Sequence, residues 1–97
     1  MSVLVLFDCE AGAGSEEAVM ARFAELFPDT RAFDGCESCT LHRDQDAPGR
    51  FVLVERWATR ANYEAYLQWR TERGDVERLA PLLAGPPTIR YFDDTPA

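Results

Sequence analysis

The chain has 97 residues, with 17 acidic and 10 basic side chains and a formal net charge of −7. A chain of this length forms a single domain, residues 1–97, with one modest hydrophobic core. The acidic balance and the lack of basic clusters argue against a nucleic-acid-binding protein and against binding to an anionic membrane surface. The apolar run at 3–7 has no positively charged region before it and is too short to cross a bilayer, so we expect a cytoplasmic protein.

Hydrophobic spacing and turn residues divide the chain into strands and helices in the order β-α-β-β-α-β. In chain order, we expect a strand at 3–9, a helix from after Ser15 to near Pro28, strands at 36–43 and 50–57, and a helix at 60–73. A shorter helix at 75–84, bent or ended near Pro81, and a last strand at 88–92 follow. This order predicts an α+β, ferredoxin-like fold, in which helices cover one face of an antiparallel sheet.

Two of the expected strands are apolar on both faces. A sheet covered on one face only should alternate apolar and polar residues, but the runs at 3–7 (VLVLF) and 51–54 (FVLV) do not alternate. The second face must therefore be hidden as well, and the chain has no spare helices to cover it. Another copy of the same chain is the simplest cover, so we expect a homodimer with two sheets packed face to face.

The cysteines do not indicate a disulfide framework or a metal site. The chain has three cysteines, an odd number, and two of them form the C-x-x-C spacing of Cys36 and Cys39. Residues three apart on a regular strand point to opposite faces, so we expect these two thiols to diverge. Only His42 could add an imidazole ligand. We therefore expect unpaired thiols and no bound metal.

The stretch at 51–69 (FVLVERWATRANYEAYLQW) carries the densest group of aromatic residues. It is expected to be a strand ending at Glu55, Arg56 and Trp57, followed by a helix with Thr59 as its N-cap. Glu55 and Arg56 should project to opposite faces, where one meets a dimer partner or either forms a salt bridge. Aromatic residues at this density are typical of a pocket for a flat organic molecule, although a tightly packed core gives the same pattern.

Several blocks of sequence match one known family. They are 33–38 (FDGCES), 48–57 (PGRFVLVERW), 63–65 (YEA) and the tail at 81–87 (PLLAGPP). With these blocks and the order of its strands, the chain resembles the antibiotic biosynthesis monooxygenase family, within the dimeric α+β barrel superfamily. The resemblance covers nearly the whole chain and implies a homodimer.

The resemblance also implies an oxygenase of phenols, quinols or anthrone-like polyketides that uses no metal or flavin cofactor. In that chemistry an electron-rich phenolate or carbanion reduces O2, while the protein binds, orients and helps to deprotonate the substrate. The chain differs from the family at three places: Tyr66 replaces a common histidine, Leu53 an asparagine and Cys39 a tyrosine. Haem-degrading relatives need a histidine after the second helix, and this chain has none there, so haem cleavage is not expected.

One histidine and one tyrosine are the candidate catalytic residues. His42 is the only histidine, and since imidazole titrates near neutral pH it is the candidate base. Its place beside the polar loop at 44–49 favours an exposed rim or hairpin position over one that faces the pocket. Tyr66 is a hydrogen-bond donor that could orient a substrate oxygen. The candidate substrate-binding residues are Trp57, Tyr63, Trp69, Asn62 and Phe7.

Two functions follow from these observations. The first is a cofactor-free monooxygenase that reacts a small aromatic, quinol or polyketide-like substrate with O2. The alternative is a non-catalytic dimer of the same fold that serves as a small-ligand-binding or stress-related protein, because a fold alone does not determine chemistry. A roomy pocket with a proton acceptor favours the enzyme, and a filled core favours the alternative.

Overall fold

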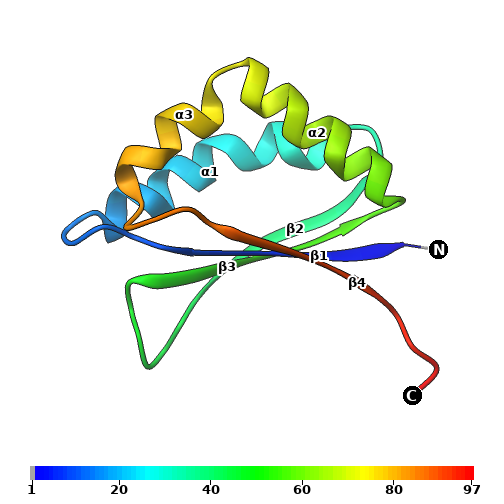
Figure 1. The fold of residues 1–97 in the computed structure, drawn as a ribbon, viewed down its shortest axis with the longest axis horizontal. Coiled ribbons are helices and arrows are strands. Elements are labelled where there is room, and N and C mark those ends of the chain that lie inside the picture. The colour runs from blue at the N-terminus through cyan, green and yellow to red at the C-terminus, as the bar shows by residue number, and fades with distance from the viewer. Residues whose placement is uncertain (1) are drawn as a thin grey trace.

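The computed structural model describes residues 2–97 and has two layers, a four-stranded sheet and a layer of helices on one of its faces (Figure 1). The strands are β1 (Val3–Glu10), β2 (Cys36–Arg43), β3 (Arg50–Trp57) and β4 (Thr88–Asp93). The helices are α1 (Glu16–Ala32), α2 (Arg60–Glu72), the short α3 (Asp75–Leu79) and a 3₁₀ turn, η1 (Ala80–Leu82). The sheet order is β2-β3-β1-β4 with antiparallel neighbours. The α+β, ferredoxin-like prediction is confirmed.

One helix end differs from the sequence prediction, and another agrees with it. Helix α1 continues past Pro28 to Ala32, because Pro28 lies on the exposed side while Phe27 and Thr30 hold the last turn against the core. The expected bend or end near Pro81 is confirmed, since the helix ends as regular α-helix at Leu79 and becomes a 3₁₀ turn at Pro81, whose ring removes a backbone donor. Within residues 2–97, no helix combines the length and hydropathy needed to cross a bilayer.

The corner between β2 and α2 depends on a glycine and a helix cap. Gly35 has a φ of +89°, and a Cβ there would lie 2.4 Å from Cγ of Asn62, so only glycine fits. The predicted N-cap is confirmed, since Oγ1 of Thr59 accepts a hydrogen bond of 3.1 Å from the backbone N–H of Asn62. These contacts fix where α2 leaves the sheet and so set which of its side chains face β3.

The two faces of the sheet have different surroundings. Toward the helices, alternate residues of β3 are buried from Phe51 through Leu53 and Glu55 to Trp57. The opposite face carries the other alternate residues, and no helix of residues 2–97 covers it (Figure 1). We call this second surface the open face. Its apolar side chains are Leu4, Leu6, Val52, Val54 and Phe92.

The expectation that Cys36 and Cys39 point to opposite faces is wrong. The register shifts between Cys36 and Ser38, so that Glu37 is an extra residue in β2. Cys36 is therefore paired with Trp57 and Cys39 with Glu55, both on the helix side of the sheet. Both thiols are unpaired. Burial raises the pKa of Cys36 to about 11 and that of Cys39 further, so both are protonated, unreactive thiols near neutral pH.

Candidate functional site

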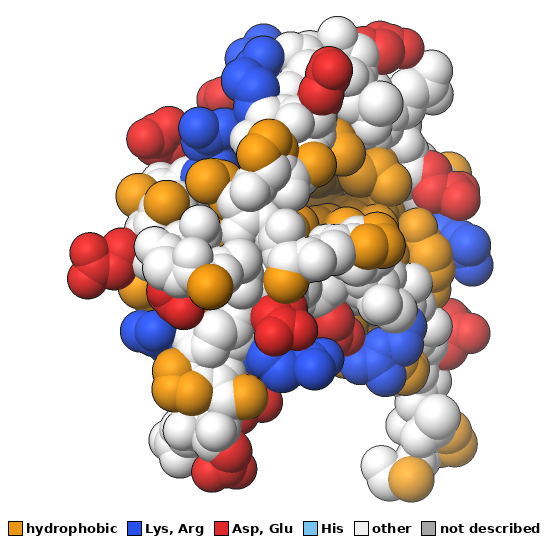
Figure 2. Space-filling model, turned by 60° about the vertical axis from the view of Figure 1, so that its left-hand side comes forward, with side chains coloured by type: hydrophobic (Ala, Val, Ile, Leu, Met, Phe, Trp, Pro, Cys, Tyr) orange, Lys and Arg blue, Asp and Glu red, His pale blue; other side chains and the backbone are white. Residues whose placement is uncertain are grey.

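A cavity of about 440 Å³ lies between the helices and the sheet. Figure 2 shows its mouth as a hollow surrounded by hydrophobic side chains. Strands β1 and β3 supply its floor, α1 and α2 its walls, and α3 with the segment at 83–87 its rim. The apolar lining residues include Phe7, Phe23, Phe27, Leu53, Leu67, Leu79, Leu83 and Ile89. This size and lining are typical of a site for a small, largely apolar organic molecule.

Glu55 is the carboxylate on the floor of this cavity. Its position in β3 places it between Val5 of β1 and Cys39 of β2, and its side chain is only 2% exposed. The indole Nε1–H of Trp57 donates a hydrogen bond of 2.9 Å to its Oε1. No Lys, Arg or His of residues 2–97 forms an ion pair with it.

These surroundings change the acidity of Glu55. Burial raises the pKa of its carboxyl group to about 7, although the hydrogen bond from Trp57 acts in the opposite direction. A carboxyl group with this pKa gains and loses a proton near neutral pH, which is the property required of a general base.

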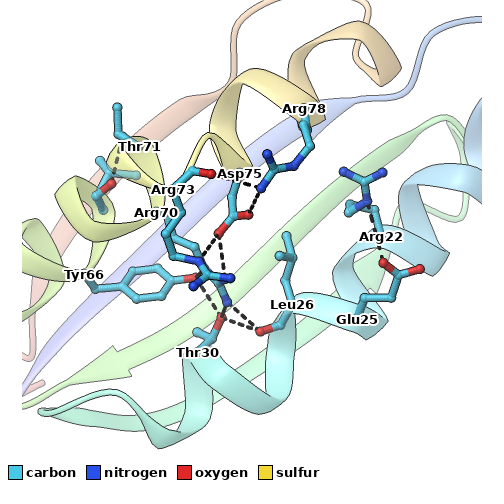
Figure 3. Close-up of polar contacts among 11 residues, drawn as sticks. Arg22, Glu25, Leu26, Thr30, Tyr66, Arg70, Thr71, Arg73, Asp75 and Arg78 are labelled. Atoms are coloured by element: carbon cyan, nitrogen blue, oxygen red, sulfur yellow. Dashed lines mark hydrogen bonds and ion pairs between the residues drawn. The ribbon is translucent and has the colours of Figure 1, made fainter.

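A second buried acid, Asp75, lies beside the cavity in a polar network centred on Arg70 (Figure 3). Arg70 donates from Nη1 to Oδ2 of Asp75 at 2.9 Å, and Arg78 and Arg73 bind the same carboxylate at 2.7 and 3.3 Å. Burial alone would raise the pKa of Asp75, but the hydrogen bonds from Arg70 and Arg78 lower it overall. Asp75 therefore stays ionised and serves as a structural anchor.

Arg70 also ties α2 to α1. It donates from Nε to the hydroxyl of Tyr66 at 3.0 Å, and from Nη2 to the Leu26 carbonyl at 2.7 Å and to Thr30 Oγ1 at 3.2 Å. The Thr30 hydroxyl donates to the Leu26 carbonyl at 3.1 Å, which leaves the Tyr66 hydroxyl as the donor in its 2.7 Å bond to Thr30. The hydroxyl hydrogen of Tyr66 is thus already used within the protein.

Tyr63 differs from Tyr66 in this respect. It also lines the cavity and is buried, but its hydroxyl makes no hydrogen bond within residues 2–97. Burial and then the nearby charge of Glu55 raise its pKa, so the phenol stays protonated. Of the two tyrosines, Tyr63 has the hydroxyl available to a ligand, while Tyr66 offers its ring.

Three of the residues predicted from the sequence line the cavity: Phe7, Tyr63 and Tyr66. Trp57 does not line it. Its side chain is fully buried behind the two tyrosines, with ring centroids 5.6 Å from Tyr63, 5.0 Å from Tyr66 and 6.1 Å from Phe33. Trp57 therefore acts on the cavity through its hydrogen bond to Glu55.

The other three predicted residues lie elsewhere. His42 is exposed on the open face, where its Nε2 lies 2.9 Å from Oγ1 of Thr40, and the sheet separates it from the cavity. Asn62 accepts a hydrogen bond of 2.7 Å from the Thr59 hydroxyl at the start of α2. Trp69 is half-buried and stacks against the guanidinium groups of Arg70 and Arg73, 4.8 and 4.9 Å from its ring centroid.

Sequence reasoning passed over Glu55, Thr30, Arg70 and Asp75 as site residues. The alternation Phe51, Leu53, Glu55, Trp57 contained the signal for one of them, since it places the glutamate on the same face as three core residues. No local pattern relates Arg70 to Thr30, which lies 40 residues earlier in the chain. Within residues 2–97, no group of three or more His, Cys, Asp or Glu side chains is placed to hold a metal ion.

Comparison with known proteins agrees with this architecture. The sequence profile of the family described as antibiotic biosynthesis monooxygenase matches residues 2–71. Comparison with curated protein sequences gave no significant match.

Three solved structures illustrate the likeness in fold. An antibiotic biosynthesis monooxygenase aligns with a TM-score of 0.85 and 23% identity over 97% of this chain and 99% of its own. A conserved protein from Methanosarcina mazei Go1 aligns with a TM-score of 0.88 and 13% identity over 98% and 94% of the two chains. The protein Rv0793 from Mycobacterium tuberculosis has a TM-score of 0.74 and 25% identity over 100% and 98%.

Proposed function

The chain belongs to the antibiotic biosynthesis monooxygenase family, and from that premise we propose that it is a cofactor-independent monooxygenase. Its substrate is a small aromatic, quinol or polyketide-like molecule that reacts with O2 in the cavity between the helices and the sheet. Glu55 is the general base, Tyr63 donates a hydrogen bond to a substrate oxygen, and Phe7 and Tyr66 contact the substrate rings. The proposed base is thus Glu55 and not His42, which lies on the open face.

The observation that carries this proposal is the buried carboxylate of Glu55 in an apolar cavity. An acid kept there only for structure would be paired with a cation, as Asp75 is. Glu55 instead has one neutral donor, Trp57, and a pKa of about 7. Removal of a substrate proton is the step that such a group can perform near neutral pH.

The chemistry balances without a further reductant when the reacting substrate carbon is a methylene group activated by an aromatic ketone, as in an anthrone. One methylene group and one molecule of O2 then give one new ketone and one molecule of water. Glu55 takes the first proton, and the carbanion passes an electron to O2 and recombines with the superoxide to form a C–O bond. Protonated Glu55 returns the proton to the peroxide. Glu55 then takes the second C–H proton as the O–O bond breaks, and the released hydroxide accepts that proton to become water.

We also propose that the protein is a homodimer formed through the open face. The apolar side chains Leu4, Leu6, Val52, Val54 and Phe92 gather there with no helix of residues 2–97 above them. Two such faces packed together would bury more than about 1,000 Å², the area of a stable interface. Light scattering at micromolar concentration tests this, and a monomeric mass would reject it.

Oxygen uptake tests the proposed activity. The purified protein is mixed with a panel of hydroquinones and anthrones, and consumption of O2 is recorded together with the oxidised product. Glu55→Gln should lower the rate by at least about 100-fold, the typical contribution of a general base. Glu64→Gln is the matched control, because Glu64 is an exposed residue of α2 that pairs with Arg60, and its rate should be unchanged.

Two outcomes would reject the proposal. Equal rates in wild type and Glu55→Gln would remove Glu55 from the mechanism. Ligand binding in the cavity without O2 consumption for any member of the panel would favour the alternative function, a non-catalytic small-ligand-binding dimer.

A further inference from the structure

The indole N–H of Trp57 has one hydrogen-bond acceptor, and the packing of the ring prevents it from reaching another. The side chain is fully buried, and the rings of Phe33, Tyr63 and Tyr66 surround it with centroids 5.0 to 6.1 Å away. The indole N–H is a donor only. Within residues 2–97 it donates to a single acceptor, Oε1 of Glu55, at 2.9 Å.

The hydrogen bond joins two residues on the same face of one strand. Trp57 and Glu55 are two apart in β3, so their side chains lie side by side beneath the helices. Packing of the indole fixes the direction of its N–H and therefore fixes Oε1. The other oxygen, Oε2, makes no hydrogen bond within residues 2–97. The two oxygens of the carboxylate are thus not equivalent.

We propose that Trp57 is a positioning residue that holds Oε1 of Glu55 and leaves Oε2 as the oxygen that exchanges a proton with the substrate. The catalytic consequence rests on the proposed function, whereas the hydrogen bond and its effect on Glu55 do not. Trp57 itself touches no substrate in this assignment, because it does not line the cavity. Its contribution is to aim the base and to favour the ionised carboxylate, since a donor stabilises negative charge.

Other titratable groups near Glu55 do not change charge near neutral pH. Cys36 and Cys39 face it from β2, and Tyr63 and Tyr66 face it from α2. Burial raises the pKa of each of these thiols and phenols, so all four stay protonated. A titration observed there between about pH 6 and 8 therefore belongs to Glu55.

Three charged groups complete the surroundings of Glu55. Arg70 of α2 and Asp75 of α3 line the same cavity and neutralise one another at 2.9 Å. On α1, Arg31 donates to the Cys39 carbonyl at 2.9 Å. None of these three groups forms an ion pair with Glu55.

Nuclear magnetic resonance of the wild-type chain tests the assignment directly. The two tryptophans give two indole N–H signals. We expect the Trp57 signal to shift with pH and to share its midpoint with the carboxyl carbon of Glu55. The Trp69 signal is the internal control and should not follow that midpoint, because its ring lies against Arg70 and Arg73. Glu55→Gln should abolish the Trp57 titration.

A variant measures the size of the effect. Trp57→Phe keeps an aromatic ring but removes the donor, so the pKa of Glu55 should rise by about one unit or more, as expected for loss of a charge-assisted hydrogen bond. The acid limb of the kcat/KM profile should move by the same amount. Trp69→Phe, the matched control, should leave both values in place. If Trp57→Phe does not fold, the pH titration of the Trp57 N–H signal in wild type and in Glu55→Gln still tests the positioning role.

The outcomes separate this inference from the proposed function. A Trp57 signal that does not respond to Glu55, or an unchanged Glu55 midpoint in Trp57→Phe, overturns the positioning role even if the protein consumes O2. A Trp57 signal that follows Glu55 supports the role even if the substrate panel is not oxidised, and that second result would reject the proposed catalysis alone.

Discussion

Glu55 and Asp75 are two buried acids that line one cavity, and their surroundings give them opposite chemical properties. Asp75 is 7% exposed and is bound by three arginines, so its pKa is lowered and it is ionised near neutral pH. Glu55 is 2% exposed and is bound by one neutral indole, so its pKa rises to about 7. The kind of hydrogen-bond donor therefore separates the structural acid from the candidate base more sharply than the degree of burial does.

The largest expected effect comes from removing the central cation of the Asp75 network. Arg70→Met leaves Asp75 without its buried partner and removes the hydrogen bonds that Arg70 donates to Tyr66, Thr30 and the Leu26 carbonyl. We expect a loss of about 3–5 kcal/mol in the free energy of unfolding, the usual effect of breaking a buried ion pair. Urea denaturation measures it. A loss below about 1 kcal/mol would show that Asp75 does not depend on Arg70.

The second effect is a difference in how stability depends on pH. Glu55 has a pKa of about 7 in the folded protein against 4.5 as a model value, so the folded state binds its proton more tightly. The contribution of Glu55 to the free energy of unfolding is fully present below a pH of 4.5 and is lost as the pH rises through about 7. Asp75 has a lowered folded pKa, so its contribution is present above its unfolded value and is lost as the pH falls toward the folded one.

The Glu55 contribution can be isolated with a variant. The change in the pKa of Glu55 corresponds to about 3 kcal/mol. As the pH rises from 4 to 8, the free energy of unfolding of Glu55→Gln should therefore increase by about that much relative to the wild-type value. Parallel urea titrations at a series of pH values measure this difference. Curves for the two proteins that stay parallel across the range would contradict a raised pKa for Glu55.

The third effect distinguishes the two cavity tyrosines. Tyr66→Phe removes a hydroxyl that is bonded to both Arg70 and Thr30, and leaving those buried partners unpaired should cost about 1–3 kcal/mol. Tyr63→Phe removes a hydroxyl with no hydrogen bond within residues 2–97 and should change stability by less than about 0.5 kcal/mol. On the proposed function, Tyr63→Phe should instead raise the KM in the oxygen-uptake assay. A large loss of stability in Tyr63→Phe together with a raised KM in Tyr66→Phe would mean that Tyr63 has the structural hydroxyl and Tyr66 the substrate-binding one.

The smallest effect is expected at the exposed edge of the Asp75 network. The side chain of Arg73 is 51% exposed and lies 3.3 Å from Asp75. Because solvent screens such a pair, Arg73→Met should lower the free energy of unfolding by about 1 kcal/mol or less. Thermal denaturation beside Arg70→Met measures the ratio of the two losses. An Arg73→Met loss equal to that of Arg70→Met would mean that burial does not rank the three arginines.

The sequence allowed most of the fold to be predicted, because local signals specify it. The order of helices and strands along the chain and the Thr59 cap both follow from spacing and residue type. Two residues of the dense aromatic stretch, Tyr63 and Tyr66, line a cavity, as the sequence predicted for a pocket wall.

The chemistry of the site could not be predicted in the same way. Burial of Glu55 could be inferred from its neighbours in β3, but whether a buried acid is paired depends on side chains from other elements. Arg70 and Thr30 meet only when α1 and α2 pack together. The role of Trp57 was also beyond the local pattern, because a core tryptophan and a pocket tryptophan have the same spacing and differ only in what the indole N–H contacts.

The extra residue in β2 limits the deletions that this protein can tolerate. Glu37 is exposed, and substitution there should cost little. Deletion is a different matter, because Glu37 is the residue that lets Cys36 and Cys39 share one face of the sheet. Without it, either Cys36 would turn outward and pull Gly35 away from Asn62, or the rest of β2 would reverse its faces. An exposed residue can therefore tolerate substitution by other side chains and still be one that the strand cannot lose by deletion.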